Sequence, residues 1–263
     1  MRINFSRFLY LFSLILFLGC SNQEANHLKK TLNIAVAANM QFAMREIANK
    51  FEQKEKVKVS LMVGASGKLT NQILNGAPFH LFVSADTTLT REIIKAGKGV
   101  DNQYIYAIGS LVLWTNNPKF KETNLFSLLD KESISKISMP NPITAPYGFQ
   151  AKLALEKAGL WNKVSTKIVI GESIAQSTQY VYDGICELGF TAKSVLYSPE
   201  LKDKGFWQEV PSQFYFPIYQ GLILTKWGSD NNKKLADSFL QFMKSTEVNK
   251  ILVNNGYKIP QKE

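Results

Sequence analysis

The sequence predicts an α/β protein with mostly parallel sheets, divided between two lobes that a two-stranded hinge joins. Short apolar runs alternate with amphipathic helical patterns, which is typical of parallel strands connected by helices. The apolar run 104–114 is too long for one ordinary strand, and the run 214–225 offers a way back. A strand that leaves one sheet to join another would give such a run. Two passages of this kind indicate two lobes with a ligand cleft between them.

The first unit of the pattern extends from Ile34 to Phe51. It opens with a short apolar run typical of a buried parallel strand. Its second half places apolar residues at i, i+3, i+4 and i+7, which predicts a helix: Met44, Ile47, Ala48 and Phe51. Asn39 lies at the junction, where its side chain is expected to act as the helix N-cap. Because a helix N-terminus has free backbone N–H groups, this junction is a candidate anion site.

The same strand-to-helix arrangement recurs three times. The predicted helix starts carry Ser66, Tyr147 and, in the last unit, Ser173 or Ile174. Asn39 and Ser66 would also serve as plain N-caps in any α/β protein. If the fold brings the four turns together, their backbone donors point to one place.

The remaining elements complete the two lobes. In chain order we expect strands at 32–37, 57–63 and 79–84, helices at 40–53, 67–75 and 87–96, a second α/β alternation over 125–191, and closing helices at 231–244 and 246–254. The expected divisions are a signal peptide (1–19), a tether (20–30), lobe 1 (31–108 and 219–263) and lobe 2 (109–218).

The N-terminal segment is expected to target the chain rather than to join the fold. Arg2 and Arg7 precede an apolar stretch, 8–18, that is too short to anchor stably across a bilayer. The following Gly19-Cys20 resembles a bacterial lipoprotein signal, although Phe17 stands where Leu is usual. The resemblance implies cleavage before Cys20 and lipid on its thiol, in the inner or outer membrane. Ordinary signal cleavage nearby is the alternative.

Composition excludes several classes of function. The net charge of +10 comes from scattered Lys and Arg residues without a basic patch interleaved with aromatic residues, so nucleic-acid binding is not expected. Two His and one Cys outside the signal cannot supply a metal-ligand cluster, and no cofactor is expected. Cys186 has apolar neighbours typical of a core thiol. His80 is expected to be structural because no other His of the globular part could join it.

Seven stretches resemble the periplasmic molybdate-binding proteins of bacterial ABC importers, in the order and spacing of that family. They are 35–39 (AVAAN), 64–69 (GASGKL), 75–86 (NGAPFHLFVSAD), 106–114 (YAIGSLVLW), 141–148 (NPITAPYG), 171–176 (GESIAQ) and 187–190 (ELGF). The resemblance implies the two-lobed type II periplasmic binding fold and capture of molybdate or tungstate. It also implies a monomer in the periplasm that delivers its ligand to a membrane permease and its ATPase.

By position, the resemblance implies an oxyanion site made of four residues. Asn39 would give a backbone N–H and a side-chain donor, and Ser66 its hydroxyl and N–H, whereas Tyr147 and Ile174 would give backbone N–H groups. Molybdenum would be bound as its oxyanion, without direct protein–metal ligands. Some members add a Tyr hydroxyl where this chain has Phe190-Thr191-Ala192, so the Tyr147 side chain could cover the site instead.

The chemistry of these residues agrees with a fully ionised tetrahedral dianion. All four positions offer donors and none is a carboxylate that could accept the proton of a partly protonated phosphate. Sulfate, phosphate or an organic anion is the alternative ligand, and size must separate molybdate from sulfate. A membrane-tethered adhesion or signalling role is a further alternative. A hydrolase would use Ser66 or Cys186 as nucleophile, but His80 is the one candidate base, so an enzyme is not expected.

Overall fold

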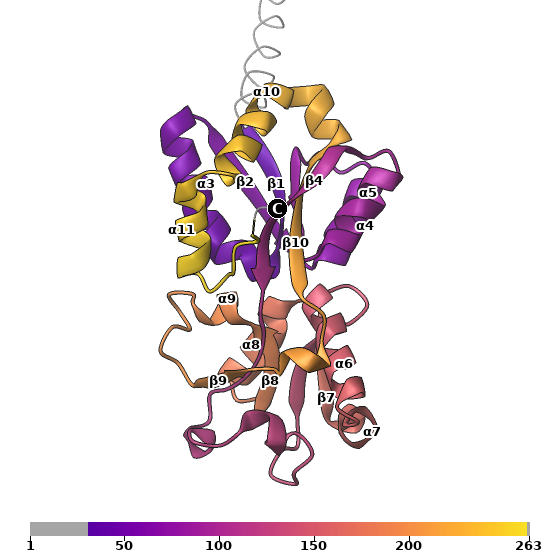
Figure 1. The fold of residues 1–263 in the computed structure, drawn as a ribbon, viewed down its shortest axis with the longest axis vertical. Helices are drawn as coiled ribbons and strands as arrows, with labels where there is room; N and C mark the ends of the chain where they lie inside the picture. The colour runs from indigo at the N-terminus through magenta and orange to yellow at the C-terminus, as the bar shows by residue number, and fades with distance from the viewer. Residues whose placement is uncertain (1–30, 262–263) are drawn as a thin grey trace, which may run out of the picture.

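The computed structural model describes residues 31–261, and its chain forms two lobes, each built around a five-stranded sheet (Figure 1). The expected signal peptide, the tether and Cys20 lie outside the described residues. Strands of lobe 1 follow the order β2 (Lys58–Gly64), β1 (Thr31–Ala37), β3 (Leu81–Val83), β10 (Ile218–Thr225) and β4 (Gly99–Gly109). Those of lobe 2 follow the order β7 (Ile168–Gly171), β6 (Ile137–Pro140), β8 (Leu188–Ala192), β5 (Leu111–Thr115) and β9 (Phe206–Glu209).

Both sheets combine a parallel half with an antiparallel half. β1 pairs in parallel with β2 and β3, and β6 with β7 and β8. The antiparallel pairs involve the strands next to the lobe crossings, β10 with β3 and β4, and β5 with β8 and β9. The expected two-lobed α/β fold with mixed sheets is therefore confirmed.

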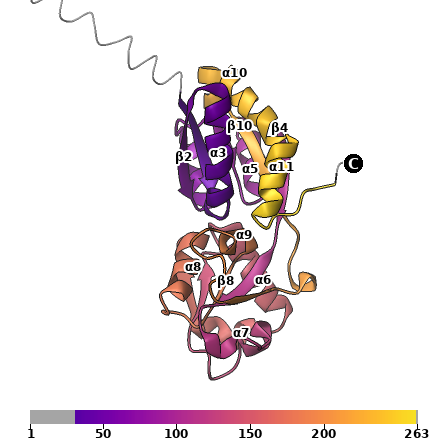
Figure 2. The same cartoon turned by 90° about the vertical axis from the view of Figure 1, so that its left-hand side faces the viewer.

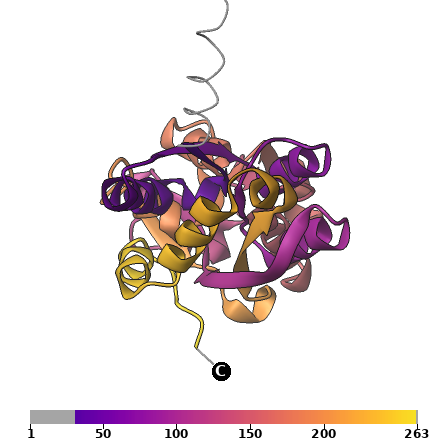
Figure 3. The ribbon, with the colours of Figure 1, turned by 90° about the horizontal axis from the view of Figure 1, so that it is seen from above.

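Helices cover both faces of each sheet, as the views from the side and from above show (Figures 2 and 3). Lobe 1 contains η1 (Ala38–Met40), α3 (Gln41–Glu55), α4 (Ser66–Leu74), α5 (Thr87–Lys95), α10 (Lys226–Met243) and α11 (Thr246–Asn254). Lobe 2 contains η2 (Pro118–Phe120), η3 (Leu125–Leu128), α6 (Pro146–Lys157), α7 (Trp161–Val164), η4 (Ser165–Lys167), α8 (Ile174–Tyr182), α9 (Lys193–Leu196) and η5 (Ser212–Phe214). Among the described residues, no helix has the length and apolar character needed to cross a membrane.

The chain crosses between the lobes at two adjacent places. β4 and β5 are separated by Ser110 alone, and Ile218, the first residue of β10, pairs with Gly109 at the end of β4. A Cβ at Gly109 would collide with the Tyr147 hydroxyl and with the Gln220 amide nitrogen. A side chain at residue 109 would therefore have to displace the ends of the two side chains that pack against the crossing.

One expectation about a helix end is wrong, and one helix is longer than expected. Asn39 does not cap α3, because Met40 holds that position without a side-chain bond, and Ala37 precedes η1 in the same way. The expected helix 231–244 corresponds to the second part of α10, after the non-helical residue Asn232, whereas α10 itself begins earlier, at Lys226. Thr225 caps its first turn by accepting a hydrogen bond from the Gly228 N–H at 2.9 Å. That turn lacks the apolar periodicity on which the expectation relied.

His80 has a structural position in lobe 1, as expected. Its Nδ1 accepts a hydrogen bond from the Asn33 N–H at 2.9 Å, and its ring packs edge-on against Trp227 with centroids 4.7 Å apart. Burial lowers the pKa of the His80 imidazole from its ordinary value of 6.5. The folded protein therefore favours neutral His80.

We expect the stability of the protein to fall as the pH drops below about 6.5, because unfolded His80 takes up a proton more readily than folded His80. The stabilisation that neutral His80 contributes is complete above pH 6.5, and it is lost as the pH falls from 6.5 to the lower pKa of His80 in the folded protein. Thermal unfolding of the wild type and of His80→Gln between pH 5 and pH 8 measures it. The variant should show a shallower pH dependence, and parallel curves would contradict the assignment.

Candidate functional site

A small cavity of about 10 Å³ lies where the two lobes meet, and the four positions expected from the sequence line it together. Its lining also includes residues at the ends of lobe 1 strands or just after them, and two residues at the start of α6: Ala37, Ala38, Gly64, Ala65, Ala85, Ala145 and Pro146. None of the lining residues is acidic or basic. The cavity therefore offers polar contacts through backbone groups and the side chains of Asn39, Ser66 and Tyr147.

Four helix N-termini meet at this cavity. Asn39 lies in η1, Ser66 is the first residue of α4, Tyr147 is the second residue of α6, and Ile174 is the first residue of α8. The first N–H groups of a helix have no partner within the helix, and the helix dipole places partial positive charge there. The arrangement is suited to an anion although no cationic side chain lines the cavity.

Asn39 contributes less to the cavity than the sequence suggested. Its Nδ2 donates to Gln220 Oε1 and to the Tyr257 hydroxyl, both at 3.0 Å. A side-chain amide has two N–H donors, and both are engaged away from the cavity. The N–H that Asn39 can offer an anion is therefore the one of its backbone.

Ser66 is oriented as a donor by a backbone group of lobe 1. Its Oγ accepts a hydrogen bond from the Ala85 N–H at 3.0 Å, and the residue is 1% exposed. A hydroxyl can accept and donate at the same time. Because one acceptor site is used by Ala85, the hydroxyl proton is available to a ligand in the cavity.

Tyr147 and Ile174 bring lobe 2 to the cavity through their backbones. The Tyr147 hydroxyl accepts a hydrogen bond from Gln220 Nε2 at 3.0 Å, so the phenol is bonded to the hinge region. Ser173 caps α8 by accepting from the Gln176 N–H at 3.3 Å, which places Ile174 at the first helical position. Thr191, in the stretch where some family members have a Tyr donor, bonds instead to the hydroxyl of Thr178 at 2.6 Å.

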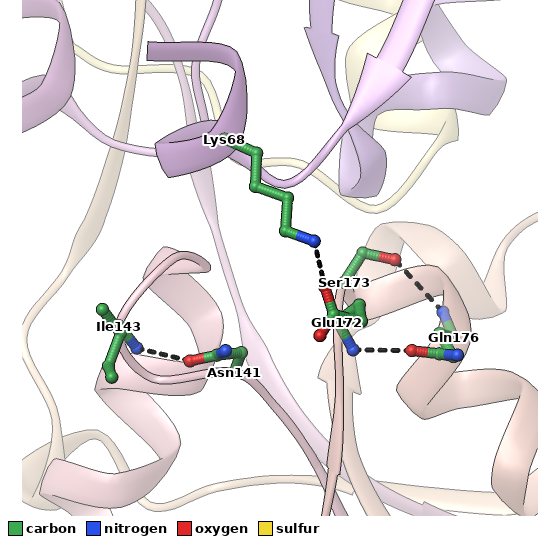
Figure 4. A network of polar contacts seen from close by, with 6 residues as sticks. All are labelled: Lys68, Asn141, Ile143, Glu172, Ser173 and Gln176. Atoms are coloured by element: carbon green, nitrogen blue, oxygen red, sulfur yellow. Dashed lines mark hydrogen bonds and ion pairs between the residues drawn. The ribbon is translucent and has the colours of Figure 1, made fainter. Parts of the chain in front are cut away.

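The lobes also contact each other beside the cavity, through α4 of lobe 1. The Gly67 N–H donates to the Thr144 carbonyl of lobe 2 at 2.8 Å. Next to it, Lys68 forms an ion pair with Glu172, and Figure 4 shows the lysine side chain extending across the gap. The loops on the lobe 2 side are held by local bonds, Ile143 N–H to Asn141 Oδ1 at 2.9 Å and Glu172 N–H to Gln176 Oε1 at 2.7 Å (Figure 4).

We expect the Lys68–Glu172 pair to contribute weakly to closure. Both side chains are about half exposed, and exposed ion pairs contribute about 0–1 kcal/mol. Lys68→Met should therefore raise the rate of anion release by less than about fivefold, and the difference should shrink at high salt. Stopped-flow measurements at two salt concentrations test this. A large, salt-independent effect would show that the pair acts by more than charge.

Several residues beside the site carry no signal in the sequence. Gln220, Tyr257 and Ser194 all bond to Asn39, although 181, 218 and 155 positions separate them from it. Ala85 lies in a loop where its useful group is a backbone N–H. The first three could be found only by knowing the fold, since no local pattern distinguishes them from other buried polar residues.

Comparison with known proteins agrees with this geometry. A family model described as a bacterial extracellular solute-binding protein matches residues 32–258. The chain belongs to this family. Two curated relatives of this solute-binding protein are the molybdate-binding proteins ModA of Azotobacter vinelandii, 36% identical, and of Rhodobacter capsulatus, 33% identical. The first match covers 91% of this chain and 92% of the Azotobacter protein. The second covers 85% of this chain and 86% of the Rhodobacter protein.

A solved structure is also similar to this solute-binding protein. The periplasmic molybdate-binding protein of Azotobacter vinelandii superposes with a TM-score of 0.82 at 30% identity. The match covers 88% of this chain and 100% of that protein. The two-lobed architecture is therefore shared over nearly the whole described chain.

Proposed function

We propose that this solute-binding protein captures molybdate, and tungstate as a close analogue, in the cavity between its lobes and delivers it to an ABC importer. The observation that carries the proposal is the convergence of four helix N-termini on a cavity without acidic or basic side chains. The molybdate-binding relatives support the choice of ligand.

The proposed oxyanion site consists of Asn39, Ser66, Tyr147 and Ile174. The backbone N–H groups of all four and the hydroxyl of Ser66 would donate to the anion oxygens. A dianion that needs donors alone is favoured over phosphate, because a protonated phosphate oxygen would require an acceptor and no carboxylate lines the cavity. The molybdenum atom needs no protein ligand in this arrangement, and the described residues contain no group of three or more His, Cys, Asp or Glu that could hold a metal.

Capture would work by closure of the lobes. We assign residues 31–108 and 219–263 to lobe 1 and 109–218 to lobe 2, so that Asn39 and Ser66 come from one lobe and Tyr147 and Ile174 from the other. An anion that bonds to both sets favours the closed arrangement, which a permease can distinguish from the open one.

The proposed location is the periplasm, where the similar Azotobacter protein is found. Residues 1–19 would act as a signal peptide and Cys20 would carry the lipid, with 20–30 as the tether. The mature protein would be a monomer. Mass spectrometry of the protein from membranes should find the diacylglyceryl modification on Cys20, and a soluble chain cleaved elsewhere would refute the anchor.

A hydrolytic function is not favoured by the chemistry of the candidate nucleophiles. Burial raises the pKa of the Cys186 thiol to about 11, and this residue packs in lobe 2 with Trp114 and Val181, away from the cavity lining. Ser66 has no His, Asp, Glu or Lys among the residues that share its cavity. A nucleophilic serine needs such a base.

Isothermal titration of the chain from Ser21 onward at pH 7 tests the proposal. Molybdate and tungstate should bind tightly and one to one, whereas sulfate and phosphate should bind weakly or not at all. If sulfate or phosphate binds as tightly as molybdate or more tightly, the proposed ligand is wrong and that anion takes its place. The absence of heat with all four anions would refute oxyanion capture.

A further inference from the structure

A buried polar cluster, called here the hinge cluster, lies beside the cavity and spans both lobes. It consists of side chains that bond to one another around β10: Asn39, Tyr106, Tyr147, Gln220 and Tyr257. All five are at most 4% exposed. The proposed function uses the backbones of two of them and leaves the role of the other three open.

Gln220 is the centre of the hinge cluster. It is fully buried on β10, two residues after Ile218 at the lobe crossing. Its Oε1 accepts hydrogen bonds from Asn39 Nδ2 at 3.0 Å and from the Tyr106 hydroxyl at 2.8 Å. Its Nε2 donates to the Tyr147 hydroxyl at 3.0 Å. One amide therefore contacts a residue of η1 in lobe 1 and a residue of α6 in lobe 2.

The two residues at the ends of this chain of bonds both line the cavity. Asn39 and Tyr147 are on opposite sides of the cleft, and each presents a helix N-terminus to it. Their side chains point to the same amide. The relative position of these two backbone donors is thus linked to the bonds of Gln220.

The energetic consequence depends on burial. A buried donor or acceptor that loses its partner costs more than the mean value of a hydrogen bond, and a low local dielectric strengthens polar contacts. Separation of the lobes would break the Tyr147–Gln220 bond, whereas the Tyr106–Gln220 bond lies within lobe 1 and would persist. Burial also raises the pKa of Tyr106 and of Tyr147 well above the ordinary value, so both hydroxyls keep their protons.

We propose that Gln220 is a positioning residue that couples anion capture to lobe closure, by holding Asn39 and the start of α6 in register across the cleft. The inference rests on the proposed function for its anion-binding consequences. Its structural consequence, a closed arrangement favoured by the Tyr147–Gln220 bond, applies to the protein without an anion as well.

Tyr147→Phe is the most direct test, because it removes the cross-lobe bond and keeps the backbone N–H that would bind the anion. We expect the dissociation rate of molybdate to rise about tenfold while the association rate changes less than about threefold. Tyr106→Phe is the matched comparison, since it removes a phenol that bonds to the same amide within one lobe. It should lower the melting temperature and raise the dissociation rate by less than about threefold.

A second pair of variants tests whether the two side chains act together. Gln220→Met should accelerate release at least as much as Tyr147→Phe, and the double variant should be no faster than Gln220→Met alone. Independent, multiplying effects would overturn the proposed coupling. The dissociation rate of the double variant therefore separates positioning from a general loss of stability, because two independent losses of stability would add to each other in the double variant.

Amide hydrogen exchange at Gly67 provides a measurement that does not need an anion. Its N–H bonds to Thr144 across the cleft, so its exchange reports separation of the lobes. Tyr147→Phe should accelerate it in the anion-free protein and Tyr106→Phe should not. A wild type that binds no molybdate would refute the proposed function alone, whereas unchanged Gly67 exchange and unchanged release in Tyr147→Phe would overturn the role of Gln220.

Discussion

Gly67→Ala is expected to weaken molybdate binding by about 1–3 kcal/mol, the usual cost of inserting a methyl group into a packed site. A Cβ at residue 67 would lie 2.9 Å from the Thr144 carbonyl oxygen and 3.0 Å from the Thr144 Cα. Both atoms belong to the backbone of lobe 2, so a small side-chain movement cannot relieve the contact. The lobes would have to stop short of their present distance, and the anion would lose full contact with one set of donors.

The same substitution should not destabilise lobe 1 by itself. Gly67 is the second residue of α4, and Ala is favoured over Gly inside a helix by about 1 kcal/mol. Titration calorimetry of Gly67→Ala should therefore show a lower affinity for molybdate. Thermal unfolding of the anion-free variant should show unchanged or higher stability. Gln72→Ala, on an exposed position of the same helix, is the control and should leave the affinity unchanged. Unaltered affinity in Gly67→Ala would mean that binding does not need the lobes this close.

Ser66→Ala is expected to weaken binding by about 1–3 kcal/mol as well, because an anion oxygen would be buried without its hydroxyl donor. The variant also removes the acceptor of the Ala85 N–H, which bonds to Ser66 Oγ at 3.0 Å. Part of the loss should therefore appear in the melting temperature of the anion-free protein. Affinity from calorimetry and stability from thermal unfolding separate the two parts.

Ser245→Ala gives the matched control for Ser66→Ala. Ser245 also accepts a backbone hydrogen bond, from the Val248 N–H at 3.3 Å, but it caps α11 and does not line the cavity. It should lower stability by about 0.5–2 kcal/mol without changing the affinity. If both variants lower the affinity equally, Ser66 acts through stability and is not a direct contact.

The strand-to-helix junctions could be predicted because their signals are local. A buried strand, a small or polar residue and an apolar stripe at helical spacing follow one another within about twenty residues, and four such junctions became the start of η1, α4, α6 and α8. The two long apolar runs likewise gave the lobe crossings. That the four junctions are neighbours in space could not be derived from these local signals, because two follow strands of the lobe 1 sheet and two follow strands of the lobe 2 sheet.

The orientation of the junction side chains could not be predicted in the same way. Asn39 has the composition of an N-cap, yet its amide is engaged by Gln220 and Tyr257 from the far end of the chain. The local preference of Asn for capping a helix is therefore outweighed by tertiary hydrogen bonds to residues of β10 and the C-terminal segment, which form only when lobe 1 has folded. The importance of Gly67 and Gly109 was hidden for a related reason, since what excludes a side chain there belongs to distant segments.

The contact of Gly67 with the Thr144 backbone limits how far the lobes can approach. This contact prevents the lobes from approaching further, because packed backbone atoms hardly compress. A smaller tetrahedral anion could not draw the lobes closer to shorten its bonds, and hydrogen bonds weaken once they are stretched. Selection between oxyanions by size would then be set by a steric contact outside the binding site, because an anion too small to reach both sets of donors at this lobe separation would bind weakly.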